Sequence, residues 1–124
     1  MFRILIIDDD HETRLLLREN LEAAGYEVEE AKNGSEALSL HRNRPFDLLI
    51  IDMFMPEKNG LEVIMELRRE NRILPIVAMS GGGELHLNGV LPIARRLGAS
   101  EILQKPFTRE EILQSVESAL QIPR

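Results

Sequence analysis

Hydrophobic residues in this chain gather into short runs that alternate with stretches in which they recur at helical spacing. Three mainly apolar runs, residues 3–7, 46–51 and 75–79, predict strands that are buried on both faces. Residues 26–31 alternate between polar and apolar positions, which predicts a more exposed strand. A last short strand is predicted over residues 101–104.

Helices are predicted between these strands, where apolar residues return every three or four positions. The first helix ends at Gly25, a residue type common at helix C-termini, and the last begins at Thr108, which is spaced for a capping box with Glu111. The predicted helices cover residues 15–24, 36–41, 61–67, 90–97 and 108–120. This strict alternation indicates an α/β fold, a doubly wound parallel sheet with helices on both faces and right-handed crossovers.

Composition narrows the possible functions. The chain has 124 residues, the size of one domain, and no cysteine, which excludes disulfides and cysteine-based zinc sites. Its 15 basic and 21 acidic residues give a net charge of −6, which disfavours direct nucleic-acid binding because that needs a basic face. No apolar run is long enough to span a bilayer and the N-terminus does not resemble a signal peptide, so we expect a soluble, cytoplasmic protein.

Polar side chains follow four of the predicted strands. Asp8 and Asp9 follow the first strand, Asp52 the third, Ser80 the fourth and Lys105 the fifth. In a doubly wound sheet these strand ends meet at one rim. Clustered carboxylates repel one another unless a cation lies among them, and their oxygen atoms suit Mg²⁺, which predicts a site for phosphoryl chemistry. The alternatives for the acids alone are a solvated loop, turn formers or helix caps.

Four segments together resemble a known family: ILIIDDD at 4–10, DLLIIDMFMPEKNGLEVI at 47–64, PIVAMSG at 75–81 and GASEILQKPF at 98–107. In this order and spacing they are similar to the receiver domain of two-component response regulators. The resemblance implies a flavodoxin-like five-stranded sheet with strand order 2-1-3-4-5. It also implies one receiver domain over residues 1–124, with its core at about 2–121.

The resemblance assigns roles to the residues at the rim. It implies that Asp52 is the phosphoacceptor and that Asp8 and Asp9 hold Mg²⁺, one directly and one largely through water. The carboxylate of Asp52 and the backbone carbonyl of Phe54 are the further ligands that it implies. Ser80 falls at the position of the switch hydroxyl, which contacts the phosphoryl group.

The resemblance extends to the residues around this pocket. It implies that Lys105 contacts the phosphoryl group and that its bond to Pro106 is cis. Pro56 and Gly60 match the loop that follows the phosphoacceptor. Asp10, the third acid in the row, is predicted to cap the first helix.

Three features depart from the family's pattern. Ile102 stands where many members have a switch aromatic, so we expect a movement of Ser80 and its loop to carry the signal instead. The glycine-rich segment 80–98 is longer than usual, which predicts an altered partner face. Phe54 and Gly82 flank the phosphoryl position and neither side chain can orient water, which predicts slow dephosphorylation.

The resemblance implies a signalling receiver and not an enzyme that turns over small molecules. We expect it to accept a phosphoryl group from a histidine kinase or phosphotransfer protein, to change conformation and to act on a downstream effector. We also expect a homodimer through the fourth helix, fifth strand and fifth helix. We expect no direct contact with nucleic acid or membrane. One alternative is a pseudo-receiver, a phosphorylation-independent interaction module. The other is a phosphohydrolase of the haloacid dehalogenase type, whose motif fails at Glu12.

Other side chains are assigned to the surface or the core. The predicted surface residues are Arg14, Arg18, Arg68, Arg69, His41 and His86. Of the apolar trio at 53–55, part is expected to pack in the core and part to form a docking surface for a kinase.

Overall fold

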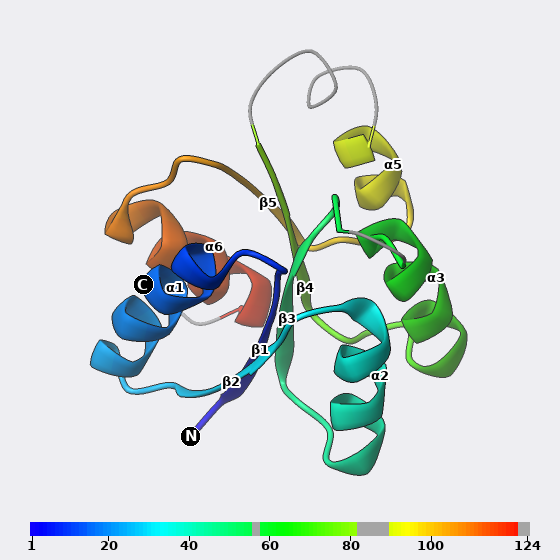
Figure 1. Ribbon diagram of the computed structural model, residues 1–124, viewed down its shortest axis with the longest axis horizontal. Coiled ribbons are helices and arrows are strands. Elements are labelled where there is room, and N and C mark those ends of the chain that lie inside the picture. Colours follow the sequence, from blue (N-terminus) through cyan, green and yellow to red (C-terminus); the bar gives the residue numbers. More distant parts are fainter. Residues whose placement is uncertain (56–57, 82–89, 122–124) are drawn as a thin grey trace.

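The computed structural model describes residues 1–55, 58–81 and 90–121. Within them, five parallel strands form one sheet in the order β2-β1-β3-β4-β5 (Figure 1). The strands are β1 (Arg3–Ile7), β2 (Glu27–Ala31), β3 (Leu48–Asp52), β4 (Ile76–Ser80) and β5 (Glu101–Gln104). The helices are α1 (His11–Ala23), α2 (Gly34–Asn43), α3 (Gly60–Glu70), α5 (Val90–Arg96) and α6 (Arg109–Leu120). The predicted doubly wound α/β fold is confirmed.

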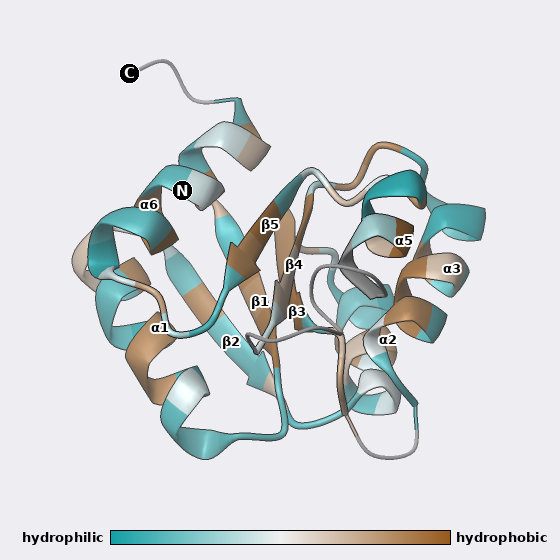
Figure 2. Ribbon diagram, turned by 90° about the horizontal axis from the view of Figure 1, so that it is seen from above, coloured by the Kyte–Doolittle hydropathy of each residue, from teal (hydrophilic) through white to brown (hydrophobic). Residues whose placement is uncertain are grey.

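Helices cover both faces of this sheet. Figure 1 shows α1 and α6 on one face, and α2, α3 and α5 on the other. In β1, Ile4 and Ile6 pack with residues of α1 and α6, whereas Leu5 and Ile7 pack with residues of α2, α3 and α5. Successive side chains of a strand point to opposite faces, so a strand between two helix layers must be apolar throughout. The strands in the centre of Figure 2 are accordingly brown, between helices that are largely teal.

Two strands run one residue further than their apolar runs predict. β3 ends at Asp52 and β4 at Ser80, where the runs stop at Ile51 and Met79. Parallel pairing continues through these ends, because Asp52 is opposite Met79 and Ser80 is opposite Gln104. Both polar side chains therefore stand on paired strand backbone, which fixes them better than a loop.

Polar caps begin the helices at the same rim of the sheet. Asp10 caps α1 with its carboxylate, as predicted. Capping boxes begin α3, where Asn59 pairs with Glu62, and α6, where Thr108 pairs with Glu111 as predicted. These caps satisfy backbone amides that otherwise have no partner in the first turn, and they fix where each helix leaves the rim.

Four of the residues predicted at the surface are buried or only partly exposed, with Arg18 and Arg68 among them. Arg14 is only 7% exposed, because α1 turns it towards the sheet together with Leu17. His41 is half-buried: its Nδ1 accepts a hydrogen bond from the backbone amide of Phe46, and the two rings stack. Burial lowers the pKa of His41, which keeps Nδ1 free to accept.

The apolar trio at 53–55 packs in part, and some other predictions fall outside the described residues. In the trio at 53–55, Met53 and Met55 are buried while Phe54 is 43% exposed, as expected for a segment that packs only in part. The predictions for Pro56, Gly82 and His86 lie outside the described residues. No helix in the described part of the chain has both the length and the apolar character needed to cross a membrane.

Candidate functional site

Three carboxylates meet at the rim formed by the carboxyl ends of the strands. Asp8 follows β1, Asp52 closes β3, and these strands are neighbours in the sheet. One carboxylate oxygen from each of Asp8, Asp9 and Asp52 lies within 4.8 Å of the other two. Asp8 is fully buried and Asp52 is 5% exposed, whereas Asp9 is open to solvent. Hard carboxylate oxygens at this spacing, with one side open, fit an ion such as Mg²⁺ that retains water ligands.

Lys105 brings one positive charge to this cluster from the end of β5. Its Nζ lies 2.9 Å from Oδ2 of Asp8 and 3.5 Å from Oδ2 of Asp52. Burial lowers the pKa of Lys105, but the hydrogen bond to Asp8 and the charge of Asp52 outweigh it and hold the pKa above its ordinary value. Because its pKa is raised, the amine stays charged between the two carboxylates. The bond from Lys105 to Pro106 is cis, as the resemblance implies.

Asp52 differs from an ordinary surface aspartate in its acidity. Burial raises its pKa to about 6; the backbone amide of Phe54 lowers it, the charge of Asp8 raises it and Lys105 lowers it. The Phe54 amide donates to Oδ1 of Asp52 at 3.1 Å and fixes one carboxylate oxygen. At neutral pH the carboxylate is ionised and oriented, so it can act as a nucleophile.

Hydrogen bonds hold both the carboxylate and the backbone of Asp8. Its Oδ1 accepts from the backbone amide of Asp10 at 2.9 Å, and its Oδ2 accepts from Lys105. Its own amide donates to the carbonyl of Ala31 at 3.2 Å. The neighbouring strand, the first helix and the lysine together fix a negative charge that is buried.

Ser80 is buried at the end of β4, on the strand next to Asp52. Its hydroxyl donates to the carbonyl of Gly81 at 3.0 Å, and among the described residues no hydrogen bond joins it to the carboxylates. The carbonyl of Ser80 accepts from the amide of Lys105 at 2.8 Å, so the backbones of these two residues are linked. The rim thus brings together the three acids and Lys105, and Ser80 ends the strand next to Asp52.

Sequence reasoning missed one residue of this site. Nη1 of Arg14 donates to the backbone carbonyl of Asp8 at 2.8 Å, and its Nε donates to Glu30 at 2.9 Å. A usable signal was present, because Arg14 stands three and seven positions before Leu17 and Leu21, on the helix face that packs against the sheet.

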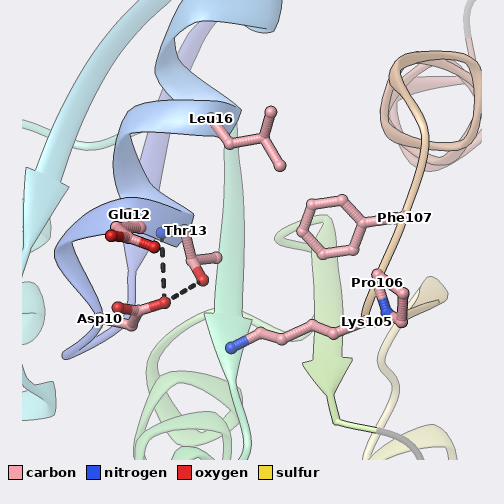
Figure 3. Close-up of a pocket in the computed structure, with 7 residues that line it drawn as sticks. All are labelled: Asp10, Glu12, Thr13, Leu16, Lys105, Pro106 and Phe107. Carbon is pink, nitrogen blue, oxygen red and sulfur yellow. Dashed lines mark hydrogen bonds between the residues drawn. The ribbon is translucent and has the colours of Figure 1, made fainter.

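A hollow of about 450 Å³ opens beside Lys105. It is lined by Asp10, Glu12, Thr13, Leu16, Lys105, Pro106 and Phe107. Figure 3 shows the lysine reaching towards the side of Asp10, while Leu16 and Phe107 supply apolar walls. The site therefore has a partly apolar approach from the side of α1.

Comparisons with known proteins agree with this geometry. The family model of the response regulator receiver domain matches residues 4–117. The chain is 38% identical over 120 residues to the transcriptional regulatory protein CpxR of Escherichia coli K12, covering 97% of this chain and 50% of that protein. It is 34% identical over 118 residues to the alkaline phosphatase synthesis transcriptional regulatory protein PhoP of Bacillus subtilis, covering 95% of this chain and 48% of that protein. The chain thus spans about half the length of these curated relatives.

Solved structures of response regulators have the same fold as this chain. A response regulator receiver domain protein from Clostridium thermocellum superposes with a TM-score of 0.88 at 27% identity, covering 98% of this chain and 95% of that one. The chemotaxis protein CheY4 of Vibrio cholerae superposes with a TM-score of 0.86 at 30% identity, covering 96% and 98%.

Proposed function

The chain belongs to the response regulator receiver domain family of two-component signalling, and from that premise we propose that it accepts a phosphoryl group on Asp52. One observation carries the proposal: the buried Asp52 carboxylate lies beside the Lys105 ammonium, 3.5 Å away, in a cluster of three acids. The phosphorylated form would then bind its partners differently from the unphosphorylated form.

In the proposed reaction, a carboxylate oxygen of Asp52 attacks the phosphorus of a phosphohistidine. An oxygen–phosphorus bond forms, the phosphorus–nitrogen bond breaks, and its electron pair passes to the imidazole nitrogen, which takes up a proton. The Phe54 amide holds one oxygen of Asp52 and so orients the carboxylate. Lys105, already positioned between two carboxylates, would pair with a phosphoryl oxygen.

The same residues fit a divalent cation. Asp8, Asp9, Asp52 and the backbone carbonyl of Phe54 would hold Mg²⁺, as the oxygen cluster of the three acids supports. Bound Mg²⁺ would offset the negative charge of the phosphoryl oxygens.

The conformational response would begin at Ser80. To donate to a phosphoryl oxygen, its hydroxyl must leave the carbonyl of Gly81. The Ser80 carbonyl is hydrogen-bonded to the Lys105 amide, so movement at the end of β4 reaches the end of β5. Ile102, which packs partly buried against the core, would follow without the ring movement of an aromatic switch.

The partners are proposed at the level of class. A histidine kinase or phosphotransfer protein would supply the phosphoryl group, and the hollow beside Lys105 would admit part of it (Figure 3). A downstream effector would read the phosphorylated state, and a homodimer through α5, β5 and α6 is one form that this response would take.

Acetyl phosphate tests the proposal directly. With Mg²⁺, a phosphoryl group passes to Asp52 and acetate leaves, so the intact mass should rise by about 80 Da. Chelation of Mg²⁺ with EDTA should suppress the increase. A protein whose mass does not change under either condition would instead be the pseudo-receiver, acting without phosphorylation.

Phe54 governs how long the proposed phosphoryl group persists. Its side chain is 43% exposed at the rim and cannot orient an attacking water molecule. We expect Phe54→Asn, which supplies a polar group, to accelerate dephosphorylation by about tenfold. Phosphate release after removal of acetyl phosphate measures this rate. The control is Ile73→Asn, at an exposed apolar residue after α3, and an unchanged or slower rate in Phe54→Asn would contradict the expectation.

A further inference from the structure

Arg14 lies behind the cluster of acids on the buried face of α1. Within the described residues its guanidinium donates two hydrogen bonds: Nη1 donates to the backbone carbonyl of Asp8 at 2.8 Å, and Nε donates to Oε1 of Glu30 at 2.9 Å. Glu30 belongs to β2, so Arg14 joins the end of β1 to the neighbouring edge strand.

Packing alone does not explain an arginine at this position. The other buried residues of α1, Leu17 and Leu21, are apolar. A buried guanidinium is tolerated only when its charge and its donors are satisfied, and an apolar side chain would be buried more cheaply. Here Nε donates to Glu30, which also balances the charge, and Nη1 donates to the backbone of Asp8, one of the proposed Mg²⁺ ligands.

The bond to Asp8 gains importance when the site is in use. In the structure, Asp8 is fixed through its carboxylate by Lys105 and the amide of Asp10. In the proposed reaction Lys105 would share its charge with a phosphoryl oxygen, which would weaken its hold on Asp8. The backbone of Asp8 is then held by two hydrogen bonds, from its amide to Ala31 and from Arg14 to its carbonyl.

We propose that Arg14 is a positioning residue: its hydrogen bond to the Asp8 carbonyl holds the Asp8 carboxylate in place to receive Mg²⁺. The inference rests on the proposed function and adds a residue to it. Groups that fix metal ligands from behind commonly change metal affinity by about 10- to 100-fold when they are removed.

Arg18 provides a matched control, one turn further along α1. It forms an ion pair with the same glutamate, its Nε lying 2.9 Å from Oε2 of Glu30, although the geometry is not that of a hydrogen bond. It also donates to a backbone carbonyl of β2, that of Val28, at 2.8 Å. In the described part of the chain, its polar contacts are with Glu22, Glu30 and Val28, and not with Asp8. Loss of Arg18 therefore disturbs the link between α1 and β2 without releasing the Asp8 carbonyl.

The experiment compares Arg14→Gln, Arg14→Lys and Arg18→Gln with the unaltered chain. Calorimetric titration with Mg²⁺ should show affinity about tenfold weaker in Arg14→Gln and changed by less than about twofold in Arg18→Gln. Arg14→Lys should recover part of the loss, because an ammonium can replace one contact but not the two that a guanidinium makes. Labelling by acetyl phosphate should need more Mg²⁺ for half its maximal rate in Arg14→Gln, with the maximal rate itself within about twofold.

Thermal unfolding of each variant separates folding from positioning. Equal losses of Mg²⁺ affinity in Arg14→Gln and Arg18→Gln would mean a structural role only, and unchanged affinity in Arg14→Gln would overturn the inference outright. If Arg14→Gln does not fold, Arg14→Lys decides the matter: affinity equal to that of the unaltered chain overturns the inference. These outcomes differ from failure of the proposed function, in which the unaltered chain itself is not labelled.

Discussion

Replacing Asp52 with asparagine is expected to abolish labelling by acetyl phosphate and, without Mg²⁺, to make the fold more stable. The first effect follows because an amide oxygen cannot replace the carboxylate as the nucleophile. The second follows from burial, since Asp52 places a negative charge next to Asp8 in a site that excludes most solvent. The Asp52 carboxylate is thus needed for labelling, while its buried charge lowers the stability of the fold.

The expected stability difference depends on pH in a definite direction. The pKa of Asp52 is about 6 in the folded protein against an ordinary value of 3.8, so between these values the folded state binds more protons than the unfolded state. The free energy of unfolding therefore falls as pH rises through this window, and stays low above it. A shift of this size corresponds to about 3 kcal/mol, which solvent at the open side reduces to about 1–2 kcal/mol.

Chemical denaturation in EDTA, at several pH values from 4 to 8, measures this difference. We expect Asp52→Asn to be more stable at neutral pH and to lose the decline through the window. The control is Asp47→Asn: Asp47 is exposed and its Oδ2 accepts from the Arg3 amide, a role that an asparagine oxygen can keep, so stability should change by less than about 0.5 kcal/mol. Labelling that persists in Asp52→Asn, or a variant less stable at neutral pH, would contradict the assignment of the buried charge.

Much of this site could be predicted from the sequence because the fold is a parallel sheet. Strands covered on both faces are apolar at every position, so β1, β3 and β4 stand out as short runs. The polar residue that ends each run then lies at the rim where such sheets bind ligands. This pattern alone predicts Asp8, Asp52 and Ser80 as residues of the rim.

Other features depend on contacts that no local pattern contains. The spacing of Arg14 from Leu17 and Leu21 places it on the buried face of α1, but its ion-pair partner, Glu30, belongs to β2 and no local pattern identifies it. His41 is half-buried because the chain after α2 turns back and places Phe46 against its ring. The strand ends at Asp52 and Ser80 are set by pairing with neighbouring strands, not by the hydrophobicity of the residues themselves.

Gly60 is expected to be the glycine least tolerant of a methyl group near the site. It is the first residue of α3, and its amide donates to the carbonyl of Met53 at 3.2 Å. A Cβ atom at this position would lie 2.5 Å from the backbone oxygen of Asp52 and 2.8 Å from Cα of Met53. Both neighbours are backbone atoms at the end of β3, and the Asn59–Glu62 capping box fixes the helix, so neither side can yield easily.

We therefore expect Gly60→Ala to lower the free energy of unfolding by about 2–3 kcal/mol, although alanine favours helices over glycine by about 1 kcal/mol. Because the crowded oxygen belongs to Asp52 itself, displacement at that residue should also slow labelling by acetyl phosphate at saturating Mg²⁺. Gly81→Ala is the control, since a Cβ atom there has no other atom within 4 Å and its stability should change by less than about 0.5 kcal/mol. Denaturant unfolding and labelling rates measure the two effects. If Gly60→Ala is as stable and as reactive as the unaltered chain, then α3 can move away from β3 without disturbing Asp52, and the close packing between them does not fix the phosphoacceptor.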